Sequence, residues 1–344
     1  MQKVAVIGAG AWGTALAIQA ARASRTAHRT AHGAANGTAA EGSVALWARD
    51  AGRAAAMQAA RENAAHLPGH RLPGAIQVTH EAGAALAGAE LALLVVPTQH
   101  LAAVLRTLPA TLPPCLVAAK GVTAAGLRLP LEILAEARPG LPAGVLSGPN
   151  FAEEIAAGLP AAAVLASTDA TLREAAAARL ASPAFRLYGQ DDPVGAQIGG
   201  AAKNVVAIAA GAVMGAGLGE NARAALVTRG LSEIARLAVA LGGRAETVSG
   251  LSGLGDLLLT CTGPGSRNFS LGFALGQGRR LEEILAARNS VTEGVATAPA
   301  LLARATAAGV EMPITEAVAA VLAGRVDVAG AMRELMARPR RHEV

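Results

Sequence analysis

The chain has 344 residues, of which 52% are hydrophobic, 16% charged and 2% aromatic, and its formal net charge is +5. This length predicts two domains with large cores. Because few aromatic side chains are available to stack on bases, the basic balance favours a small phosphorylated ligand over nucleic acid. No run of about 18 strongly apolar residues predicts membrane insertion, and the N-terminus lacks the pattern of a secretory signal, so we expect a cytoplasmic protein.

The first predicted element is an apolar strand that runs into a glycine-rich turn, "VAVIGAGAWGTALA". Gly8, Gly10 and Gly13 have G-x-G-x-x-G spacing between a strand and a helix, which predicts a dinucleotide-binding turn. Gly8 would allow the tight turn, Gly10 the approach of the pyrophosphate, and Gly13 the packing of helix on strand. The start of the helix would supply N–H groups and partial positive charge to the phosphates.

Residues 24–42 contain a duplicated "RTAH" and show no apolar periodicity, so they are predicted to form an inserted surface loop. His28 and His32 stand four residues apart, but no cysteine or carboxylate partner accompanies them, which favours solvated histidines over a metal site. Cys115 and Cys261 likewise lack metal or redox spacing and are interpreted as small core residues. We therefore predict no metal ion.

The end of the second predicted strand, "SVALWARD", bears on which dinucleotide fits. An acid at this position binds the ribose hydroxyls of NAD, whereas an arginine accommodates the 2′-phosphate of NADP. Arg49 and Asp50 stand side by side here. Both cofactors therefore remain open, and Arg49 favours NADP(H).

Further buried strands in "AELALLVVPTQ", "CLVAAKG" and "GVLSGPNF" alternate with alanine-rich helical stretches. This alternation predicts an α/β Rossmann domain with a doubly wound parallel sheet, which we place at residues 1–190. Ligands of such sheets bind beyond the carboxyl ends of the strands. Lys120 is therefore expected near the substrate and the nicotinamide, and a surface lysine that happens to follow a strand is the alternative.

Residues 191–338 show helical patterns and no good strand, which predicts an all-α second domain, followed by a basic tail at 339–344. Within it, Lys203 is the only charged residue between Asp192 and Glu220, in a chain with three lysines and 27 arginines. Arginine keeps its proton near neutral pH, whereas a buried lysine can lose it. Lys203 is therefore predicted to transfer a proton.

The residues spaced four apart with Lys203 are nearly all small, and they form a groove for another helix or for a ligand. They are Gly199, Lys203, Ala207, Gly211, Gly215 and Gly219. The alternative to a catalytic Lys203 is helix packing, with the charged end of the lysine reaching outward to water.

A second group of polar residues lies in "LSGLGDLLLTCTGPGSRNFSLG". Asp256 is the lone acid of an apolar segment, and it would orient or balance the charge of Lys203. Ser266, Arg267 and Asn268 follow a Pro-Gly turn at a predicted helix start, and this combination of donors favours a phosphate site. The alternative is a purely structural ion pair between Asp256 and an arginine.

Taken in order, these motifs resemble those of the bacterial NAD(P)-dependent glycerol-3-phosphate dehydrogenases. The matching segments include "GAGAWGTALA", "LSGPNFAEEIAAGLP", "GAQIGGAAKNVVAIAAG" and "GLSGLGDLLLTCTGPGSRN". The resemblance implies a Rossmann domain and a helical domain like the C-terminal domain of 6-phosphogluconate dehydrogenase. It also implies a homodimer, and reversible reduction of dihydroxyacetone phosphate to sn-glycerol 3-phosphate with NADPH or NADH, for phospholipid synthesis.

The resemblance further implies roles for single residues, with Lys203 as the catalytic acid/base. The implied substrate contacts are Lys120, Gly148, Asn150, Lys203, Asp256, Ser266, Arg267 and Asn268. With the three glycines of the turn, Gly8, Gly10 and Gly13, the implied cofactor contacts are Trp12, Arg49, Lys120, Ala152, Arg267, Val291 and Glu293. Two positions depart from the family pattern: Asn150 replaces a frequent serine or threonine, and His66 replaces an aromatic residue.

Two other functions fit part of this pattern. A related hydroxyacid dehydrogenase would act on a carboxylate substrate instead of a phosphate. A nucleotide sensor would bind NADP(H) without turnover, but it leaves the two lysines in apolar surroundings unexplained.

Overall fold

The computed structural model describes residues 3–32, 43–263, 265–287 and 292–339. The chain forms two compact units: unit 1 comprises residues 1–119 and 129–193, and unit 2 comprises residues 120–128 and 194–344. Residues 120–128, which the sequence assigned to the strand-rich domain, therefore group with the helices. Within unit 2 the Arg304 guanidinium donates a hydrogen bond of 2.5 Å to the Leu127 carbonyl.

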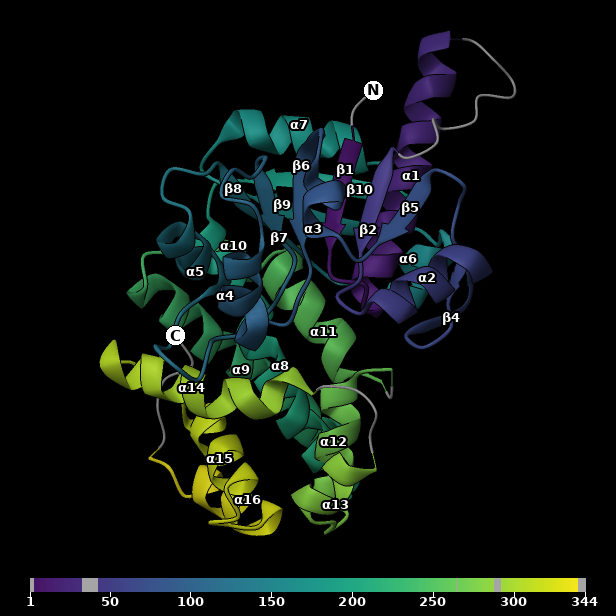
Figure 1. Ribbon diagram of the computed structural model, residues 1–344. Coiled ribbons are helices and arrows are strands. Elements are labelled where there is room, and N and C mark those ends of the chain that lie inside the picture. The colour runs from purple at the N-terminus through teal and green to yellow at the C-terminus, as the bar shows by residue number, and fades with distance from the viewer. Residues whose placement is uncertain (1–2, 33–42, 264, 288–291, 340–344) are drawn as a thin grey trace. The chain divides into compact units, whose positions relative to one another are not determined.

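Unit 1 is built on an eight-stranded sheet (Figure 1). In order across the sheet the strands are β10 (Phe185–Gln190), β9 (Ala161–Ala166), β8 (Ala143–Ser147), β7 (Cys115–Val117), β6 (Ala89–Leu94), β1 (Lys3–Ile7), β2 (Val44–Trp47) and β5 (Ile76–Thr79). Neighbouring strands are parallel except β8 and β9, which pair antiparallel. The predicted parallel sheet is confirmed from β8 to β5, and β9 and β10 extend it in the reverse direction. A separate hairpin joins β3 (Glu62–Asn63) to β4 (Leu67–Arg71).

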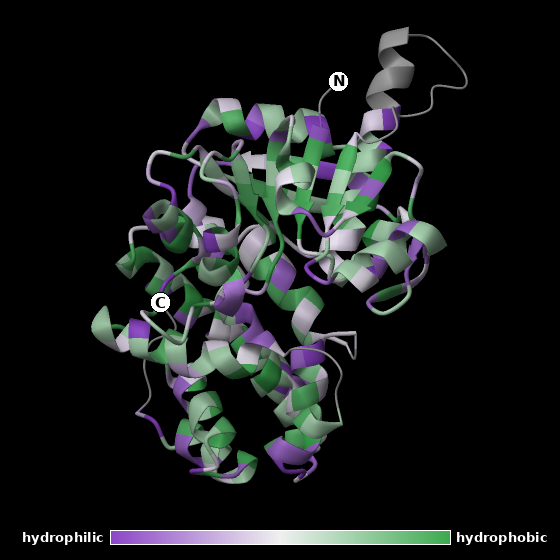
Figure 2. Ribbon diagram, in the orientation of Figure 1, coloured by the Kyte–Doolittle hydropathy of each residue, from purple (hydrophilic) through white to green (hydrophobic). Residues whose placement is uncertain are grey.

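Helices cover both faces of the sheet because successive strand residues point to opposite sides. Val4 and Val6 of β1 belong to one buried cluster, and Ala5 and Ile7 belong to another. The first cluster includes residues of α1 (Ala11–His32), α2 (Ala51–Ala60), α6 (Ala152–Ala157) and α7 (Ala170–Leu180), and the second includes residues of α3 (Ala82–Leu86), α4 (Thr98–Thr107) and α5 (Pro130–Ala137). Figure 2 shows the resulting apolar strands in green.

The first helix is longer than the sequence predicted. It continues to His32, so the predicted surface loop is wrong over residues 24–32. The repeated "RTAH" contains alanine and arginine and neither glycine nor proline, so nothing in it breaks the helix. Residues 33–42, the rest of the predicted loop, lie outside the described residues.

Unit 2 has no strand among its described residues, as the all-α prediction requires. Its elements are α8 (Pro193–Gly215), α9 (Gly219–Ala240), α10 (Ala245–Val248), the π-helical turn η1 (Leu251–Gly255), α11 (Asp256–Cys261), α12 (Arg267–Gly276), α13 (Leu281–Ala286), α14 (Glu293–Ala307), α15 (Pro313–Leu322) and α16 (Val328–Met336). Contrary to our expectation, α8 is long and apolar enough to cross a membrane by length and composition alone. However, 83% of its apolar window is buried inside the protein, which is the environment of a core helix.

Glycines bring α12 into direct backbone contact with α8. A Cβ atom on Gly211 would lie 2.0 Å from the carbonyl oxygen of Phe269, and one on Gly272 would lie 1.9 Å from the carbonyl oxygen of Ile208. No side chain fits at such distances. The C-terminal half of the small-residue row on α8 is therefore a surface for packing another helix, which was one of the two alternatives.

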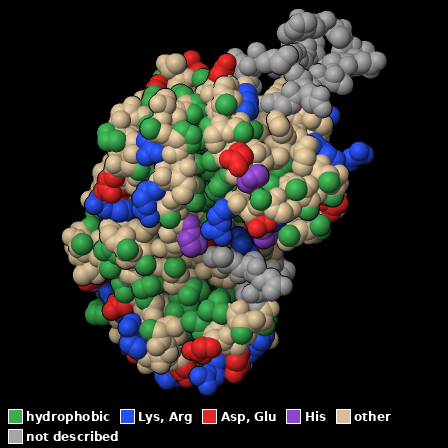
Figure 3. All heavy atoms as spheres, in the orientation of Figure 1, with side chains coloured by type: hydrophobic (Ala, Val, Ile, Leu, Met, Phe, Trp, Pro, Cys, Tyr) green, Lys and Arg blue, Asp and Glu red, His purple; other side chains and the backbone are tan. Residues whose placement is uncertain are grey.

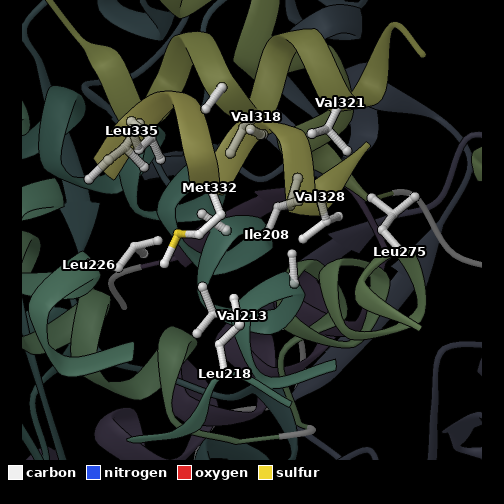
Figure 4. A pocket seen from close by; sticks show the side chains of 15 residues that line it. Ile208, Val213, Leu218, Leu226, Leu275, Val318, Val321, Val328, Met332 and Leu335 are labelled. Atoms are coloured by element: carbon white, nitrogen blue, oxygen red, sulfur yellow. The ribbon is translucent and has the colours of Figure 1, made fainter. Parts of the chain in front are cut away.

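An apolar cavity of about 50 Å³ lies within unit 2 (Figure 4). Figure 4 shows Val318 of α15 and Met332 of α16 across the cavity from Ile208 and Val213 of α8. All of the lining side chains are aliphatic or thioether groups. Because the lining offers no polar group to orient a substrate, this cavity is not a candidate catalytic site.

The cysteines and the surface charges follow the sequence prediction. Cys115 and Cys261 are buried free thiols, and burial raises the pKa of each thiol to about 12, which keeps both in the unreactive thiol form. Figure 3 shows basic and acidic side chains interspersed over the face that it presents. The basic charge is therefore spread out on this face.

Glu233 of α9 is a buried carboxylate that caps the start of α15. Its side-chain oxygens accept hydrogen bonds from the backbone N–H groups of Ile314 and Thr315, at 2.7 and 3.4 Å. Burial raises the pKa of Glu233 from 4.5 to about 7, although these hydrogen bonds and the charge of Arg236 act in the opposite direction. The folded protein therefore holds a proton at Glu233 in a pH range where the unfolded chain has released it.

We expect Glu233→Gln to remove a pH-dependent contribution to stability. Because the folded-state pKa is raised, the proton on Glu233 stabilises the fold fully below pH 4.5, and this contribution is lost as the pH rises through about 7. As the pH rises through this range, the free energy of unfolding of the unmodified protein should therefore fall relative to that of the variant, by about 3 kcal/mol at most. Urea unfolding at several pH values between 5 and 8 measures this difference. Glu316→Gln, at an exposed acid of α15, is the control, and parallel curves for all three proteins would contradict the prediction.

Candidate active site

The glycine turn of unit 1 has the geometry of a cradle for a diphosphate. Gly8 has a φ of +121°, which favours glycine, and a Cβ on Gly13 would lie 1.8 Å from the Gly8 carbonyl oxygen. By contrast, no atom lies within 4 Å of the position of a Cβ on Gly10, so the backbone is open to a ligand there. The helix α1 begins immediately afterwards at Ala11. The predicted dinucleotide turn therefore fits a dinucleotide.

The end of β2 lies beside this turn, as the NAD(P) prediction requires. Ile7 of β1 pairs with Trp47 of β2, and the Gly8 N–H donates to the Trp47 carbonyl at 3.2 Å. Arg49 follows two residues later and is exposed. Trp12 is partly buried and packs against the core cluster beside the sheet. Val291, another predicted cofactor contact, lies outside the described residues.

Unit 2 brings together the two lysines and the aspartate that the sequence singled out. The Lys203 ammonium lies 2.5 Å from Oδ1 of Asp256, and the Lys120 ammonium lies 2.5 Å from Oδ2 of the same carboxylate. Lys203 also lies 3.0 Å from the Thr260 hydroxyl. The Asp256 side chain is 1% exposed, so it is not a surface charge. Asp256 therefore pairs with lysines, and the alternative of an ion pair with arginine is wrong.

The surroundings of Lys203 adjust its amine for proton transfer near neutral pH. The pKa of Lys203 is lowered from 10.5 to about 8, because burial and the charge of Lys120 outweigh the charge and hydrogen bond of Asp256, which raise it. Because Lys203 is buried and its ammonium is bonded within the unit, the alternative of a lysine reaching outward to water is excluded. A near-neutral pKa gives a useful population of both protonation states, which suits an acid/base catalyst.

Close backbone packing fixes the distance between Lys203 and Asp256. A Cβ on Gly199, one turn before Lys203, would lie 2.7 Å from the Ser252 carbonyl oxygen in η1. Asp256 begins α11 directly after this π-helical turn. A Cβ on Gly253 would lie 1.9 Å from the Val248 carbonyl oxygen, so η1 itself is tightly folded. The N-terminal half of the α8 row is therefore a contact that aligns the lysine with its carboxylate.

The predicted phosphate residues stand at the start of α12. Ser266 is the N-cap residue, and its hydroxyl accepts the Phe269 N–H at 3.2 Å. Arg267 is exposed, whereas Asn268 is buried. Asn268 donates to the Asn204 side chain at 2.9 Å and accepts the Gly294 N–H at 3.0 Å. Its amide is therefore bonded within the helical unit.

Glu293, at the start of α14, lies within electrostatic reach of this whole group. Burial raises its pKa, while the charges of Arg267, Lys120 and Lys203 act in the opposite direction. The Asn204 amide also lies 3.4 Å from the Glu293 carboxylate. Three of the predicted cationic residues and Glu293 thus share one polar region of unit 2.

Gly148 and Asn150 follow β8 in unit 1. Gly148 has a φ of +139°, and a Cβ there would lie 3.1 Å from the Ala163 Cα atom. The Asn150 amide donates to the Ala162 carbonyl at 3.2 Å, and its buried Oδ1 atom has no hydrogen-bond partner. Ala152 begins α6 and packs against the core cluster beside the sheet. Asn150 Oδ1 is therefore a buried acceptor that a ligand could satisfy.

Sequence reasoning missed several polar residues beside these groups. Thr260 and Asn204 hydrogen bond to the predicted residues in unit 2. Asn63 in unit 1 donates to the Ala9 carbonyl within the glycine turn, at 3.0 Å. Two of them carried a signal: Thr260 stands four residues after Asp256 on a helix, and Asn204 directly follows Lys203. Asn63 carried none, because it is distant in sequence from the turn.

Comparison with protein families identifies the chain. Models of the N-terminal and C-terminal parts of NAD-dependent glycerol-3-phosphate dehydrogenase match residues 3–173 and 192–333. The chain belongs to this family. Among similar glycerol-3-phosphate dehydrogenases, a protein from Acidiphilium cryptum named as NAD(P)+-dependent is 54% identical over 98% of both chains, and one from Caulobacter vibrioides is 50% identical over 99% of both.

A solved structure supports the same fold. The glycerol-3-phosphate dehydrogenase of Coxiella burnetii has 36% sequence identity and a TM-score of 0.88, with 98% of this chain and 99% of that chain covered. The Rossmann fold and the helical C-terminal part predicted from the sequence are thus those of the glycerol-3-phosphate dehydrogenase family.

Proposed function

We propose that the protein catalyses the reversible NAD(P)H-dependent reduction of dihydroxyacetone phosphate to sn-glycerol 3-phosphate. The observation that carries this proposal is the pair of lysines joined through the buried Asp256, in a chain of the glycerol-3-phosphate dehydrogenase family. A dehydrogenase of this kind needs an acid/base group for the carbonyl oxygen, and Lys203 has the pKa and burial for it.

Lys203 donates the proton in the direction of reduction. As the carbonyl oxygen of the substrate becomes an alkoxide, the Lys203 ammonium gives it a proton and becomes a neutral amine, which Asp256 and Thr260 hold in place. Lys120 adds positive charge that favours the developing oxyanion. In the direction of oxidation the neutral amine takes the proton from the hydroxyl group.

The start of α12 is proposed to bind the substrate phosphate. Arg267 provides a charged fork for the phosphate oxygens, and Ser266 and Asn268 hold the helix start that presents it. Binding energy from the phosphate then positions the carbonyl for reaction. Gly148 and Asn150 are the further substrate contacts that we propose from unit 1.

The glycine turn of unit 1 is proposed to hold the dinucleotide diphosphate, and the bound reduced nicotinamide supplies the hydride. The open space at Gly10 supports this assignment. The remaining proposed cofactor contacts are Gly8, Trp12, Gly13, Arg49, Lys120, Ala152, Arg267, Val291 and Glu293.

The cellular setting is also a proposal. We infer that the protein acts in the cytoplasm as a homodimer and supplies glycerol 3-phosphate for phospholipid synthesis. The family membership supports this role, and light scattering coupled to size-exclusion chromatography tests the dimer.

Oxidation of NADPH and NADH, followed in parallel by absorbance with dihydroxyacetone phosphate, tests the reaction. We expect turnover with dihydroxyacetone phosphate and no comparable rate with 3-oxoacids of similar size. Faster turnover of a 3-oxoacid would indicate that the protein is a hydroxyacid dehydrogenase. Cofactor binding without turnover of any ketone would indicate a nucleotide sensor.

Gly199→Ala should change the pH dependence of the reaction. The added methyl group would push η1 away from α8 and weaken the Lys203–Asp256 ion pair. Because Asp256 raises the pKa of Lys203, the pKa should fall, and the loss of reduction activity with rising pH should begin at a lower pH. Steady-state kinetics at several pH values measures this shift.

Gly215→Ala is the matched control for Gly199→Ala. It is on the same helix, and its added Cβ would lie 2.0 Å from the Phe273 carbonyl oxygen, a closer clash than that at Gly199 but far along α8 from Lys203. We expect Gly215→Ala to lower stability without moving the pH profile. An identical profile for both variants would show that Gly199 does not set the lysine–carboxylate distance.

A further inference from the structure

Arg53, which sequence reasoning did not select, reaches the glycine turn of unit 1. It lies in the first turn of α2, four residues after Arg49, and its guanidinium donates a hydrogen bond to the Ala9 carbonyl between Gly8 and Gly10. Asn63 donates to the same carbonyl at 3.0 Å, so Ala9 is satisfied without Arg53. The buried Nε atom of Arg53 has no hydrogen-bond partner. Arg53 thus brings to the turn a positive charge that the Ala9 carbonyl does not need for its own hydrogen bonding.

The acid that could favour NAD is directed elsewhere. Asp50 is the N-cap of α2, and its Oδ1 atom accepts the backbone N–H of Arg53 at 2.7 Å. An N-cap carboxylate in this position stabilises its own helix. The other basic residues near the turn are Arg49, which is exposed, and His66, whose pKa is lowered by burial and by the charge of Arg53.

These groups form a cationic edge where the end of β2 meets the glycine turn. In Rossmann domains this is the place of the adenosine ribose, and a positive side chain here accommodates a 2′-phosphate. An arginine offers a planar fork of donors that matches phosphate geometry. Arg49 and Arg53, which precede and follow Asp50 in the chain, together offer two such forks.

We propose that Arg53, acting with Arg49, binds the 2′-phosphate of NADP(H) and makes this chain prefer NADP(H) over NAD(H). The proposal rests on the dinucleotide site of the proposed function and adds a specificity-determining residue to it. Arg53 contacts the cofactor through the phosphate that NAD lacks, so its effect is confined to one of the two cofactors.

The test is calorimetric titration of the whole protein with adenosine 2′,5′-bisphosphate and with 5′-AMP, which differ only in the 2′-phosphate. We expect the unmodified protein to bind the bisphosphate more tightly. Arg53→Gln should weaken the bisphosphate about tenfold or more and leave 5′-AMP within about twofold. Arg53→Lys keeps the charge but not the planar guanidinium. Its affinity for the bisphosphate should therefore lie between those of the unmodified protein and Arg53→Gln.

Arg71→Gln is the control, because it removes an exposed arginine from β4 in the same unit. We expect it to bind both ligands like the unmodified protein. Equal weakening of both ligands by Arg53→Gln, or no weakening of either, would overturn the role of Arg53 and leave the dinucleotide site standing. Failure of the unmodified protein to bind either ligand would instead overturn the dinucleotide site itself.

Discussion

Replacing Lys203 with arginine should lower kcat for dihydroxyacetone phosphate reduction by about 10²–10⁴-fold. Arginine keeps the positive charge beside Asp256, but its pKa is too high for it to release a proton near neutral pH. The loss should therefore appear in kcat more than in the binding of substrate. Steady-state kinetics of the purified variant measures both.

The pH dependence gives a second readout of the same residue. With a pKa of about 8, Lys203 carries its proton below pH 8 and loses it above. Reduction needs the protonated amine, so its rate should fall as the pH rises through 8, whereas the rate of oxidation should rise over the same range. Lys203→Arg should abolish both trends.

Lys3→Arg is the matched control for this substitution. Lys3 donates to the backbone carbonyls of Ala84 and Ala87, at 3.0 and 2.8 Å, within unit 1. We expect its activity and pH profile to match those of the unmodified protein. Near-normal turnover by Lys203→Arg would remove Lys203 from the proposed mechanism, whatever else the protein binds.

Replacing Arg267 with alanine should raise KM for dihydroxyacetone phosphate by about 10–100-fold, the usual worth of a hydrogen-bonded charge pair. The reason is that the proposed phosphate site loses its only guanidinium at the start of α12. Because the phosphate helps to position the carbonyl, a smaller fall in kcat should accompany the change. Initial rates over a range of substrate concentrations give both constants.

Unphosphorylated dihydroxyacetone shows whether Arg267→Ala removes a contact with the substrate phosphate or disrupts the active site in general. The unmodified enzyme and Arg267→Ala should reduce this poor substrate equally slowly. Arg280→Ala, which removes an exposed arginine 3.6 Å from Glu282, should leave KM unchanged. An unchanged KM in Arg267→Ala, or an equal loss with both substrates, would show that Arg267 does not bind the phosphate.

The features that local patterns determine were predictable from the sequence. The strand that ends in the glycine turn, the helices of unit 2 and the role of Ser266 as a helix cap all depend on residues that are adjacent or one turn apart. The isolation of Lys203 in an apolar helix likewise pointed to a buried amine, which the structure shows.

Features that depend on distant residues were not predictable in the same way. The sharing of Asp256 by Lys120 and Lys203 joins three separate segments, and no spacing in the sequence encodes it. The contact of Arg53 with Ala9 spans 44 residues. The continuation of α1 to His32 was missed for a different reason, because absence of apolar periodicity was taken as absence of helix.

The engagement of every lysine has a practical consequence for chemical labelling. All three lysines fall in the described part of the chain: Lys3 is bonded to backbone carbonyls, and Lys120 and Lys203 are held by Asp256. Amine-directed reagents such as succinimidyl esters or glutaraldehyde therefore meet few reactive side chains on the folded protein. Inactivation by such a reagent would report on the Asp256 cluster, and immobilisation of the protein is better directed at its many arginines or its carboxylates.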